Sequence, residues 1–221
     1  MGLGTFLHGD PQPSTPGVTI GPARTYELFS TVAFGGRRRK VFTRLVDLSG
    51  AGPGDRVLDV GCGPGFLTRL AADAVGPGGT AHGIDPSPSV IAYARQATVE
   101  ANCSFDLGVA ENLDAPDGTF DVVLSCLMIH HLPADLRPQA LAEIFRVLRP
   151  GGRLLVADFR PPSSRVGRHL VGAATGSQMQ HNPIHLLEPL ARDAGFEVVG
   201  RGDLRPYLSF VQARRPIPVA E

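Results

Sequence analysis

The strongest constraint on the fold is a run of alternating glycines between a predicted strand and a predicted helix. The sequence VLDVGCGPGFLT spans residues 57–68, and its apolar first part predicts a buried strand. Helical spacing of apolar residues begins at Phe66. Glycine permits positive φ and close approach of the backbone to a bound molecule, while a helix start offers free N–H groups. We therefore expect a nucleoside-bearing ligand at this strand–turn–helix unit.

The spacing of these glycines disfavours two common nucleotide sites. Dinucleotide enzymes use G-x-G-x-x-G, whereas here the third glycine comes one residue early and Phe66 stands at the last glycine position. A phosphate-binding P-loop needs a lysine after its glycines, and the chain's single lysine, Lys40, is far from them in sequence. A nicotinamide cofactor and phosphate hydrolysis are both disfavoured.

The rest of the chain predicts an α/β fold. Beyond Gly50, short β-branched runs alternate with helical segments, a pattern typical of a parallel sheet with helices on both faces. Strands are expected at 56–60, 79–84, 104–108, 120–126, 152–159, 196–200 and 207–214, and helices at 66–75, 87–100, 137–148 and 183–193. The last two strands are joined by a turn at 201–206, so the sheet should end in an antiparallel hairpin.

The 221 residues, 43% of them hydrophobic, suit one large domain with an appendage. Residues 1–24 are rich in Gly and Pro and predict a flexible N-terminal arm. Residues 25–50 predict two helices that cap the site, and 51–221 hold the main domain. Within it, the long irregular stretch 160–187 is expected to act as a lid or substrate loop.

Charge and cysteine content exclude several partners. The 21 Lys and Arg balance 21 Asp and Glu, so no net field attracts nucleic acid or anionic lipid. The longest apolar run, 122–129, is far too short to span a bilayer. An odd number of cysteines, Cys62, Cys103 and Cys126, suits reduced thiols. A cytoplasmic protein with no nucleic-acid or membrane partner is expected.

A basic run, Arg37-Arg38-Arg39-Lys40, opens the second N-terminal helix. Positive charge at this end opposes the helix dipole, so helix stability does not explain it. A solvated face is the favoured interpretation, with contact to a phosphate or an acidic partner as the alternative.

An acid, Asp85, ends the second predicted strand. An acid at this place can accept both hydroxyls of a ribose. The alternative is an N-cap for the next helix, but Ser87, directly before Pro88, already suits that role. The ribose role is therefore favoured.

Four segments in the same order resemble class I S-adenosylmethionine-dependent methyltransferases. They are VLDVGCGPG at 57–65, GIDPS at 83–87, PDGTFDVV at 116–123 and RVLRPGGRLLVAD at 146–158. The resemblance is closest to the small-molecule branch that includes the quinone-biosynthesis enzymes, and it covers about residues 25–214. It implies a Rossmann-like, seven-stranded, mostly parallel sheet with an antiparallel last strand, and makes 51–221 a methyltransferase domain.

The same resemblance implies S-adenosylmethionine as cofactor and a set of residues around it. The glycine turn would line its methionine and ribose, Asp85 would hold the ribose, and Pro86 and the segment after the third strand would meet the adenine. The implied cofactor-binding residues are Tyr26, Gly61, Cys62, Gly63, Gly65, Asp85, Pro86, Ala110, Glu111, Asn112, Ser125 and Leu127. Relatives commonly carry an acid where this chain has Val109, so a bond to the adenine amino group must come from elsewhere or be absent.

The substrate is expected to be a small organic molecule with an oxygen, carbon or nitrogen acceptor. Methylases of exocyclic amines and of glutamine carry an Asn/Asp-Pro-Pro-Tyr tetrad after the fourth strand, and this chain reads SCLM at 125–128. The expected pocket is bounded by Tyr26, by 128–132 and by 160–187. The sequence leaves open whether the protein is a monomer or a homodimer.

Four histidines are candidates for a catalytic base. His130 and His131 follow the fourth strand, and His181 and His185 lie in the expected lid. For the first pair, structural packing is the favoured interpretation and a catalytic base is the alternative. The second pair does not predict a metal site, because Pro183 lies between them and no third ligand is apparent. Cys62 is interpreted as a small packing residue.

A second hypothesis is a non-catalytic regulatory module that binds S-adenosylmethionine or S-adenosylhomocysteine on the same fold. The cofactor motifs suit both. The expected lid favours turnover, because a sensor has no need to enclose a second molecule.

Overall fold

The computed structural model describes residues 34, 36–160 and 184–218. The predicted arm, the first N-terminal helix with Tyr26, and the lid from 161 to 183 with His181 lie outside the described residues.

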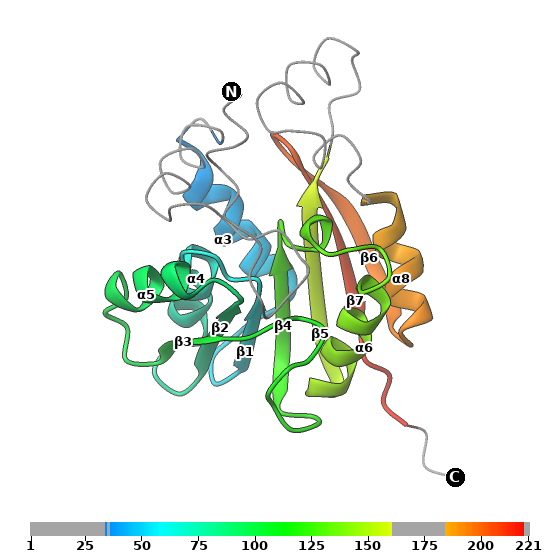
Figure 1. Cartoon of the computed structure of the whole chain (residues 1–221), viewed down its shortest axis with the longest axis horizontal. Coiled ribbons are helices and arrows are strands. Elements are labelled where there is room, and N and C mark those ends of the chain that lie inside the picture. The colour runs from blue at the N-terminus through cyan, green and yellow to red at the C-terminus, as the bar shows by residue number, and fades with distance from the viewer. Residues whose placement is uncertain (1–33, 35, 161–183, 219–221) are drawn as a thin grey trace.

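The centre of the molecule is one seven-stranded sheet in the order β3-β2-β1-β4-β5-β7-β6 (Figure 1). Its strands are β1 Arg56–Val60, β2 Thr80–Asp85, β3 Cys103–Leu107, β4 Phe120–Cys126, β5 Leu148–Phe159, β6 Glu197–Leu204 and β7 Leu208–Arg214. Strands β1 to β5 pair in parallel, and β7 is antiparallel to both of its neighbours. The predicted fold class is confirmed, including the antiparallel last strand.

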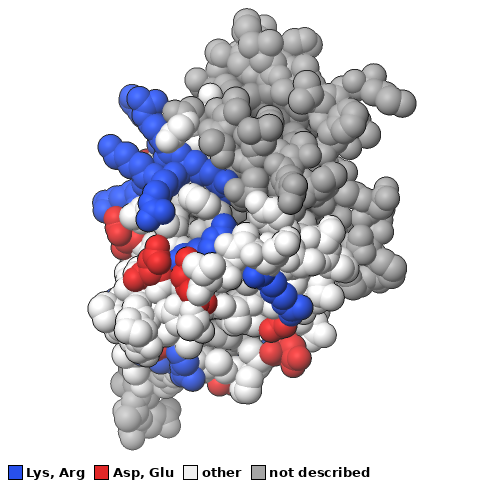
Figure 2. All heavy atoms as spheres, turned by 90° about the vertical axis from the view of Figure 1, so that its left-hand side faces the viewer, with Lys and Arg blue, Asp and Glu red and all other residues white. Residues whose placement is uncertain are grey.

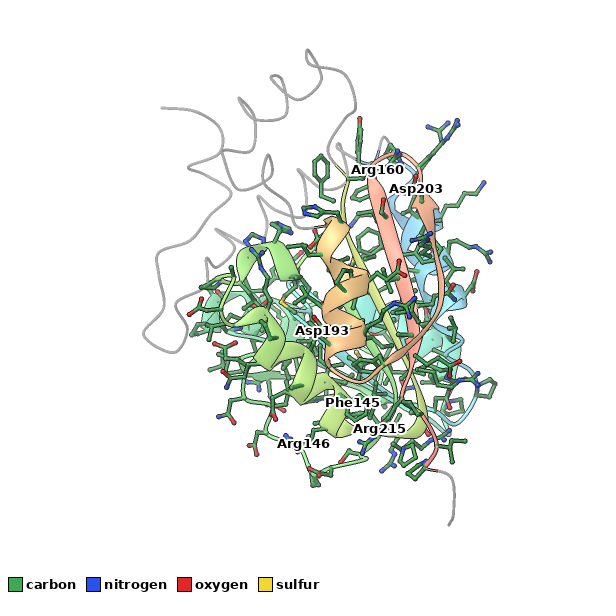
Figure 3. The ribbon with its side chains drawn as sticks, turned by 90° about the vertical axis from the view of Figure 1, so that its right-hand side faces the viewer. Phe145, Arg146, Arg160, Asp193, Asp203 and Arg215 are labelled. Atoms are coloured by element: carbon green, nitrogen blue, oxygen red, sulfur yellow. The ribbon has the colours of Figure 1, made fainter. Side chains whose placement is uncertain are left out.

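Helices cover both faces of the sheet. They are α3 Arg38–Ser49, α4 Phe66–Val75, α5 Pro88–Gln96, α6 Arg137–Val147 and α8 Leu187–Asp193, with 3-10 turns η1 Ile129–His131 and η3 Ile184–Leu186. Buried side chains of α3 and α4 share one core cluster with the sheet, those of α6 and α8 share a second, and Ile91 and Ala94 of α5 belong to a third. Figure 3 shows α6 and α8 side by side on their face.

Several predicted boundaries coincide with the structure, and others do not. The bounds of β1, α4 and β4 are as predicted. β5 begins at Leu148 rather than at 152, because Leu148 already pairs with Phe120 before an irregularity in the register. α5 ends at Gln96 rather than at 100, and β6 continues to Leu204, so the hairpin turn is shorter than predicted.

Helix α3 packs against α4 and the sheet. Its apolar stripe, Val41, Phe42, Leu45 and Val46, is buried, and the helix ends at Gly50 with a φ of 73°. The Phe42 ring lies edge-on to the ring of Phe66, with a centroid distance of 5.6 Å. This contact fixes the start of α3 beside the start of α4 and therefore beside the glycine turn.

Candidate active site

The glycine turn between β1 and α4 needs glycine at two of its positions. Gly61 and Gly65 have φ values of 74° and 80°, in the left-handed region. A Cβ on Gly61 would collide with the side chain of Met128, and a Cβ on Gly65 would collide with the ring of Phe105. The turn is therefore packed tightly against the residues that follow β4 and against β3.

The turn is bonded to the end of β2. The Gly61 and Cys62 N–H groups both donate to the Ile84 carbonyl oxygen at 2.9 Å. The Gly63 N–H donates to Oδ2 of Asp85 at 3.1 Å. The fold thus brings together the two features that the sequence singled out, the glycine turn and the acid.

Asp85 serves the backbone and keeps capacity for a ligand. Its Oδ1 accepts the N–H of Ser87 at 3.0 Å, and burial raises the pKa of Asp85 to about 6. Ser87 is the N-cap residue of α5, with Pro88 directly after it, as predicted; its hydroxyl lies 3.2 Å from that of Ser89 and makes no side-chain cap bond. Each carboxylate oxygen accepts one N–H and has a second lone-pair site, as a ribose hydroxyl requires.

A hollow lies beside the glycine turn, with residues of α3, β1, α4 and the end of β4 around it. Six of its lining residues are Arg38, Asp59, Gly61, Phe66, Cys126 and Leu127. It therefore carries a buried cation and a buried acid next to the turn.

Arg38 corrects the prediction of a wholly solvated basic run. Its side chain is buried, with 6% of the residue exposed, and the guanidinium carbon lies 4.0 Å from the centre of the Phe66 ring. The ring at the position that breaks the dinucleotide motif thus serves as a platform for a cation.

The other members of the run behave as predicted. Arg37, Arg39 and Lys40 are exposed, and Arg39 lies 4.0 Å from the carboxylate of Asp73. Figure 2 shows positive side chains gathered on this side of the molecule, with acidic ones close by. Position 38 alone in the run faces inward, because it shares a helix side with the buried Val41 and Phe42.

Asp59 is a site residue that sequence reasoning missed. It is 1% exposed, and the Thr68 hydroxyl donates to its Oδ2 at 2.7 Å. Burial raises the pKa of Asp59 to about 7, and the charge of Asp85 adds to this shift. The available signal was a carboxylate inside an otherwise apolar strand, which is rarely found without a function or a partner.

The end of β4 holds a strained residue. Leu127 has a φ of 60°, and it is the one non-glycine residue with positive φ in the described part of the chain. Such a backbone costs about 1–3 kcal/mol and is concentrated at functional sites. Its N–H donates to the Ala157 carbonyl oxygen at 2.9 Å, which holds this conformation beside the hollow.

Ser125 lies two residues before Leu127 and is buried. Its Oγ has no hydrogen-bond partner among the described residues. Because side chains alternate along a strand, Ser125 points to the opposite face of β4 from Cys126, which lines the hollow. Its predicted contact with the methionine portion stays a prediction.

A histidine–aspartate pair joins the turn after β4 to the last residues of β5. His130 Nδ1 lies 2.7 Å from Oδ1 of Asp158, and the His130 N–H donates to Oδ2 at 3.2 Å. The two side chains are 5% and 0% exposed. The ring of His131 lies 4.1 Å from that of His130. Asp158 fixes one ring nitrogen of His130 and was not predicted as a site residue.

The remaining predicted residues are placed as follows. Ala110 is buried, Glu111 is half-buried and Asn112 is exposed, in a tight turn where the Asn112 N–H donates to the Val109 carbonyl oxygen at 3.3 Å. Pro86 is half-buried directly after Asp85. His185 is exposed in η3 and does not line the hollow.

The three cysteines are free thiols, and the described residues form no metal site. Cys62 packs with Ile91, Ala94 and Phe105, and burial raises the pKa of its thiol well above the usual value. All three cysteines are unpaired. Within residues 34, 36–160 and 184–218, no three His, Cys, Asp or Glu side chains gather as a metal site would require. No described helix has the length and apolar character to cross a bilayer.

The strand order, the glycine turn and the adjoining acid define a nucleoside-binding protein of the Rossmann-like class. A methyltransferase-domain family model matches residues 57–152. The ubiquinone/menaquinone biosynthesis C-methyltransferase UbiE of Teredinibacter turnerae is 36% identical over 170 residues, which cover 74% of this chain and 67% of that protein. The chain belongs to the class I S-adenosylmethionine-dependent methyltransferases, in the branch that includes the quinone-biosynthesis enzymes.

Other relatives agree with this family. UbiE of Ectopseudomonas mendocina is 38% identical over 146 residues, or 64% of this chain, which spans 56% of that protein's length. A solved S-adenosylmethionine-dependent methyltransferase of Aquifex aeolicus has the same fold, with a TM-score of 0.73, 20% identity, and coverage of 89% of this chain and 100% of that one.

Proposed function

We propose that this chain transfers a methyl group from S-adenosylmethionine to a small organic molecule. The observation that carries the proposal is the charge arrangement of the hollow. Arg38 offers a guanidinium for the carboxylate of an amino acid, Asp59 offers a carboxylate for its ammonium group, and Asp85 lies one strand away for a ribose. Family membership supports the same cofactor.

The hollow also discriminates against a dinucleotide. A diphosphate carries two negative charges and would meet the buried carboxyl of Asp59 beside the turn. The residues present therefore fit an amino-acid group better than a diphosphate.

When bound, S-adenosylmethionine supplies an electrophilic methyl group on a sulfonium. The protein's residues have to bind it, orient an acceptor in line with it and exclude water. No protein nucleophile is required, in agreement with the neutral, buried thiol of Cys62.

A carbon acceptor on a hydroxylated ring is the proposed substrate class. The two curated relatives are named as C-methyltransferases of ubiquinone/menaquinone biosynthesis. A ring carbon becomes nucleophilic when a neighbouring hydroxyl loses its proton. After the methyl group has moved, that carbon loses its own hydrogen as a proton and the ring oxygen regains one, which restores the aromatic ring. With Nδ1 of His130 held by Asp158, Nε2 is the nitrogen that accepts the hydroxyl proton. Small molecules with an oxygen or a nitrogen acceptor remain the alternative substrates.

The His130–Asp158 pair supports this proposal over a non-catalytic module. A module that only senses the cofactor needs no buried histidine with a fixed ring at the carboxyl end of the sheet. The cytoplasmic location and the oligomeric state stay predictions.

The test combines binding with transfer. Calorimetry with S-adenosylhomocysteine and NAD should show micromolar binding of the first and none of the second. Isotopically labelled S-adenosylmethionine, incubated with hydroxylated aromatic and quinol compounds, should label a small molecule on carbon. Binding of S-adenosylhomocysteine without transfer to any compound or to a cell metabolite extract would support the regulatory module instead.

A further inference from the structure

We propose that one polar stripe of α6, formed by Gln139, Glu143 and Arg146, positions the segment that reads the adenine of the cofactor. The segment is 108–117, which follows β3 and contains Ala110, Glu111 and Asn112. The inference rests on the proposed function, because it assumes that the bound molecule carries adenine.

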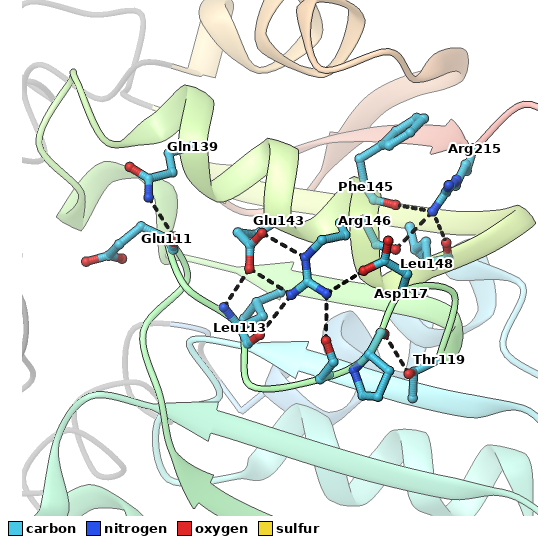
Figure 4. A network of polar contacts seen from close by, with 12 residues as sticks. Glu111, Leu113, Asp117, Thr119, Gln139, Glu143, Phe145, Arg146, Leu148 and Arg215 are labelled. Atoms are coloured by element: carbon cyan, nitrogen blue, oxygen red, sulfur yellow. Dashed lines mark hydrogen bonds and ion pairs between the residues drawn. The ribbon is translucent and has the colours of Figure 1, made fainter.

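The three side chains share one face of the helix, because positions i, i+4 and i+7 are neighbours on its surface. The opposite face, formed by Ala140, Leu141, Ile144 and Val147, is buried in the core. The polar face is turned toward the segment 108–117 rather than toward water alone (Figure 4).

Arg146 is the centre of this network. Its Nη1 donates to the Ala115 carbonyl oxygen at 2.7 Å and to Oδ1 of Asp117 at 2.8 Å. Its Nη2 donates to the Leu113 carbonyl oxygen at 2.9 Å. The fork of the guanidinium therefore binds two carbonyls and a carboxylate of one segment, an arrangement that an ammonium group cannot reproduce.

Glu143 and Gln139 extend the network toward the predicted adenine-binding residues. Glu143 accepts two bonds from Arg146 at 2.9 Å, and its Oε2 also accepts the Leu113 N–H at 2.8 Å. The Arg146 contact lowers the pKa of Glu143, so the acceptor stays ionised. Gln139 Nε2 donates to the Glu111 carbonyl oxygen at 2.9 Å.

The other end of the segment is tied to the predicted ribose site. The Gly108 N–H donates to the Asp85 carbonyl oxygen at 3.3 Å, and Leu107 pairs with Asp85 in the sheet. Residues 110–112 are thus held on one side by the contact with Asp85 and on the other by the contacts with α6. Because Val109 cannot accept a hydrogen bond through its side chain, reading of the base depends on Glu111 and on the backbone, and hence on where α6 holds them.

Arg215 provides a matched control. It also binds the C-terminal end of α6, where its Nη1 donates to the carbonyl oxygens of Phe145, Arg146 and Leu148 at 2.9, 2.9 and 2.6 Å. Figure 3 shows Arg146 and Arg215 at the same end of α6. The bonds of Arg215 go to the helix end and none goes to the segment 108–117.

The experiment measures the affinity of the full chain for two probes by calorimetric competition. S-adenosylhomocysteine contains adenine, and S-ribosylhomocysteine has a hydroxyl in its place. Arg146→Met should weaken binding of the first by about tenfold and of the second by less than about twofold. Gln139→Ala, at an exposed position with one bond, should weaken only the first, by about two- to fourfold. Arg215→Met should lower the melting temperature and leave the ratio of the two affinities unchanged.

Three outcomes would overturn the inference. Equal weakening of both probes by Arg146→Met would assign it a general structural role. Unchanged affinities in Arg146→Met and Gln139→Ala would remove the positioning role altogether, and if Arg146→Met does not fold, Gln139→Ala decides alone. If the wild type bound neither of the two probes, the proposed cofactor would be refuted. That result differs from the ones that refute the positioning role of α6, in which the wild type still binds S-adenosylhomocysteine.

Discussion

The two halves of the candidate site meet at the carboxyl end of β4 but are built differently. The hollow with Arg38 and Asp59 lies on the side covered by α3 and α4, and its turn comes from the contiguous segment 57–68. The His130–Asp158 pair joins residues 28 apart, which meet because β4 and β5 pair in parallel. The glycine turn of the cofactor half is thus local in sequence, although Arg38 and Asp85 reach it from other elements, whereas the His130–Asp158 pair is created wholly by the pairing of strands.

This difference predicts a separation of effects. Changes in the first half should alter cofactor affinity, and changes in the second should alter turnover at constant affinity.

The largest effect is expected in the reactive half. His130→Ala should reduce turnover by about 10²- to 10⁴-fold, because the acceptor hydroxyl loses its base. Asp158→Asn should reduce it less and shift the pH profile, since it changes the partner of Nδ1. S-adenosylhomocysteine affinity of both variants should stay within about twofold of wild type. A His130→Ala enzyme with wild-type rates and a flat pH profile would leave proximity as the whole mechanism.

In the cofactor half, Asp85→Ala should weaken S-adenosylhomocysteine binding by about 2–3 kcal/mol, because two charge-assisted bonds to the ribose are lost. A loss of apo stability of about 1 kcal/mol should accompany it, since the N–H groups of Gly63 and Ser87 lose their acceptor. Calorimetry and thermal unfolding separate the two numbers. A large stability loss with unchanged affinity would make Asp85 a purely structural residue.

Asp59→Asn is expected to stabilise the apo protein and to weaken binding of the cofactor. The pKa of Asp59 is raised to about 7, so its contribution to stability is present near pH 4 and is lost as pH rises through 7. The amide keeps an acceptor for the Thr68 hydroxyl. At pH 8 the variant should have a higher free energy of unfolding than the wild type, and the difference should close toward pH 4. A difference that is independent of pH would contradict the titration of Asp59.

Local patterns in the sequence predicted the parts that depend on backbone geometry. The glycine turn, Asp85 and the bounds of β1, α4 and β4 follow from spacing and apolar periodicity within a few residues. They could be predicted because the conformations of glycine and the alternation of a strand are properties of the segment itself.

The missed residues depend on contacts between distant segments. In the sequence, Arg38 is one of four similar charges. It points inward because it shares a side of α3 with buried apolar residues and stacks on the ring of Phe66. Asp158 contacts His130 only because β5 pairs with β4, and the sequence does not show this pairing. In the sequence, the polar stripe of α6 is indistinguishable from a solvent-exposed helix face. Only the structure shows that the segment 108–117 packs against it. A charge run does not predict which of its charges is buried, and an amphipathic pattern does not predict which segment covers the polar face of the helix.

We assign the hollow beside the glycine turn to the amino-acid end of the cofactor, and a change at Arg38 probes this assignment. S-adenosylhomocysteine and 5′-methylthioadenosine share adenosine and sulfur, but the second lacks the amino-acid group. We expect Arg38→Met to weaken the first by about tenfold and to leave the second within about twofold, because a single ion pair to a carboxylate is lost. Arg39→Met, one residue along and exposed, should change neither. Equal weakening of both ligands by Arg38→Met, or no weakening of S-adenosylhomocysteine, would contradict this assignment of the hollow.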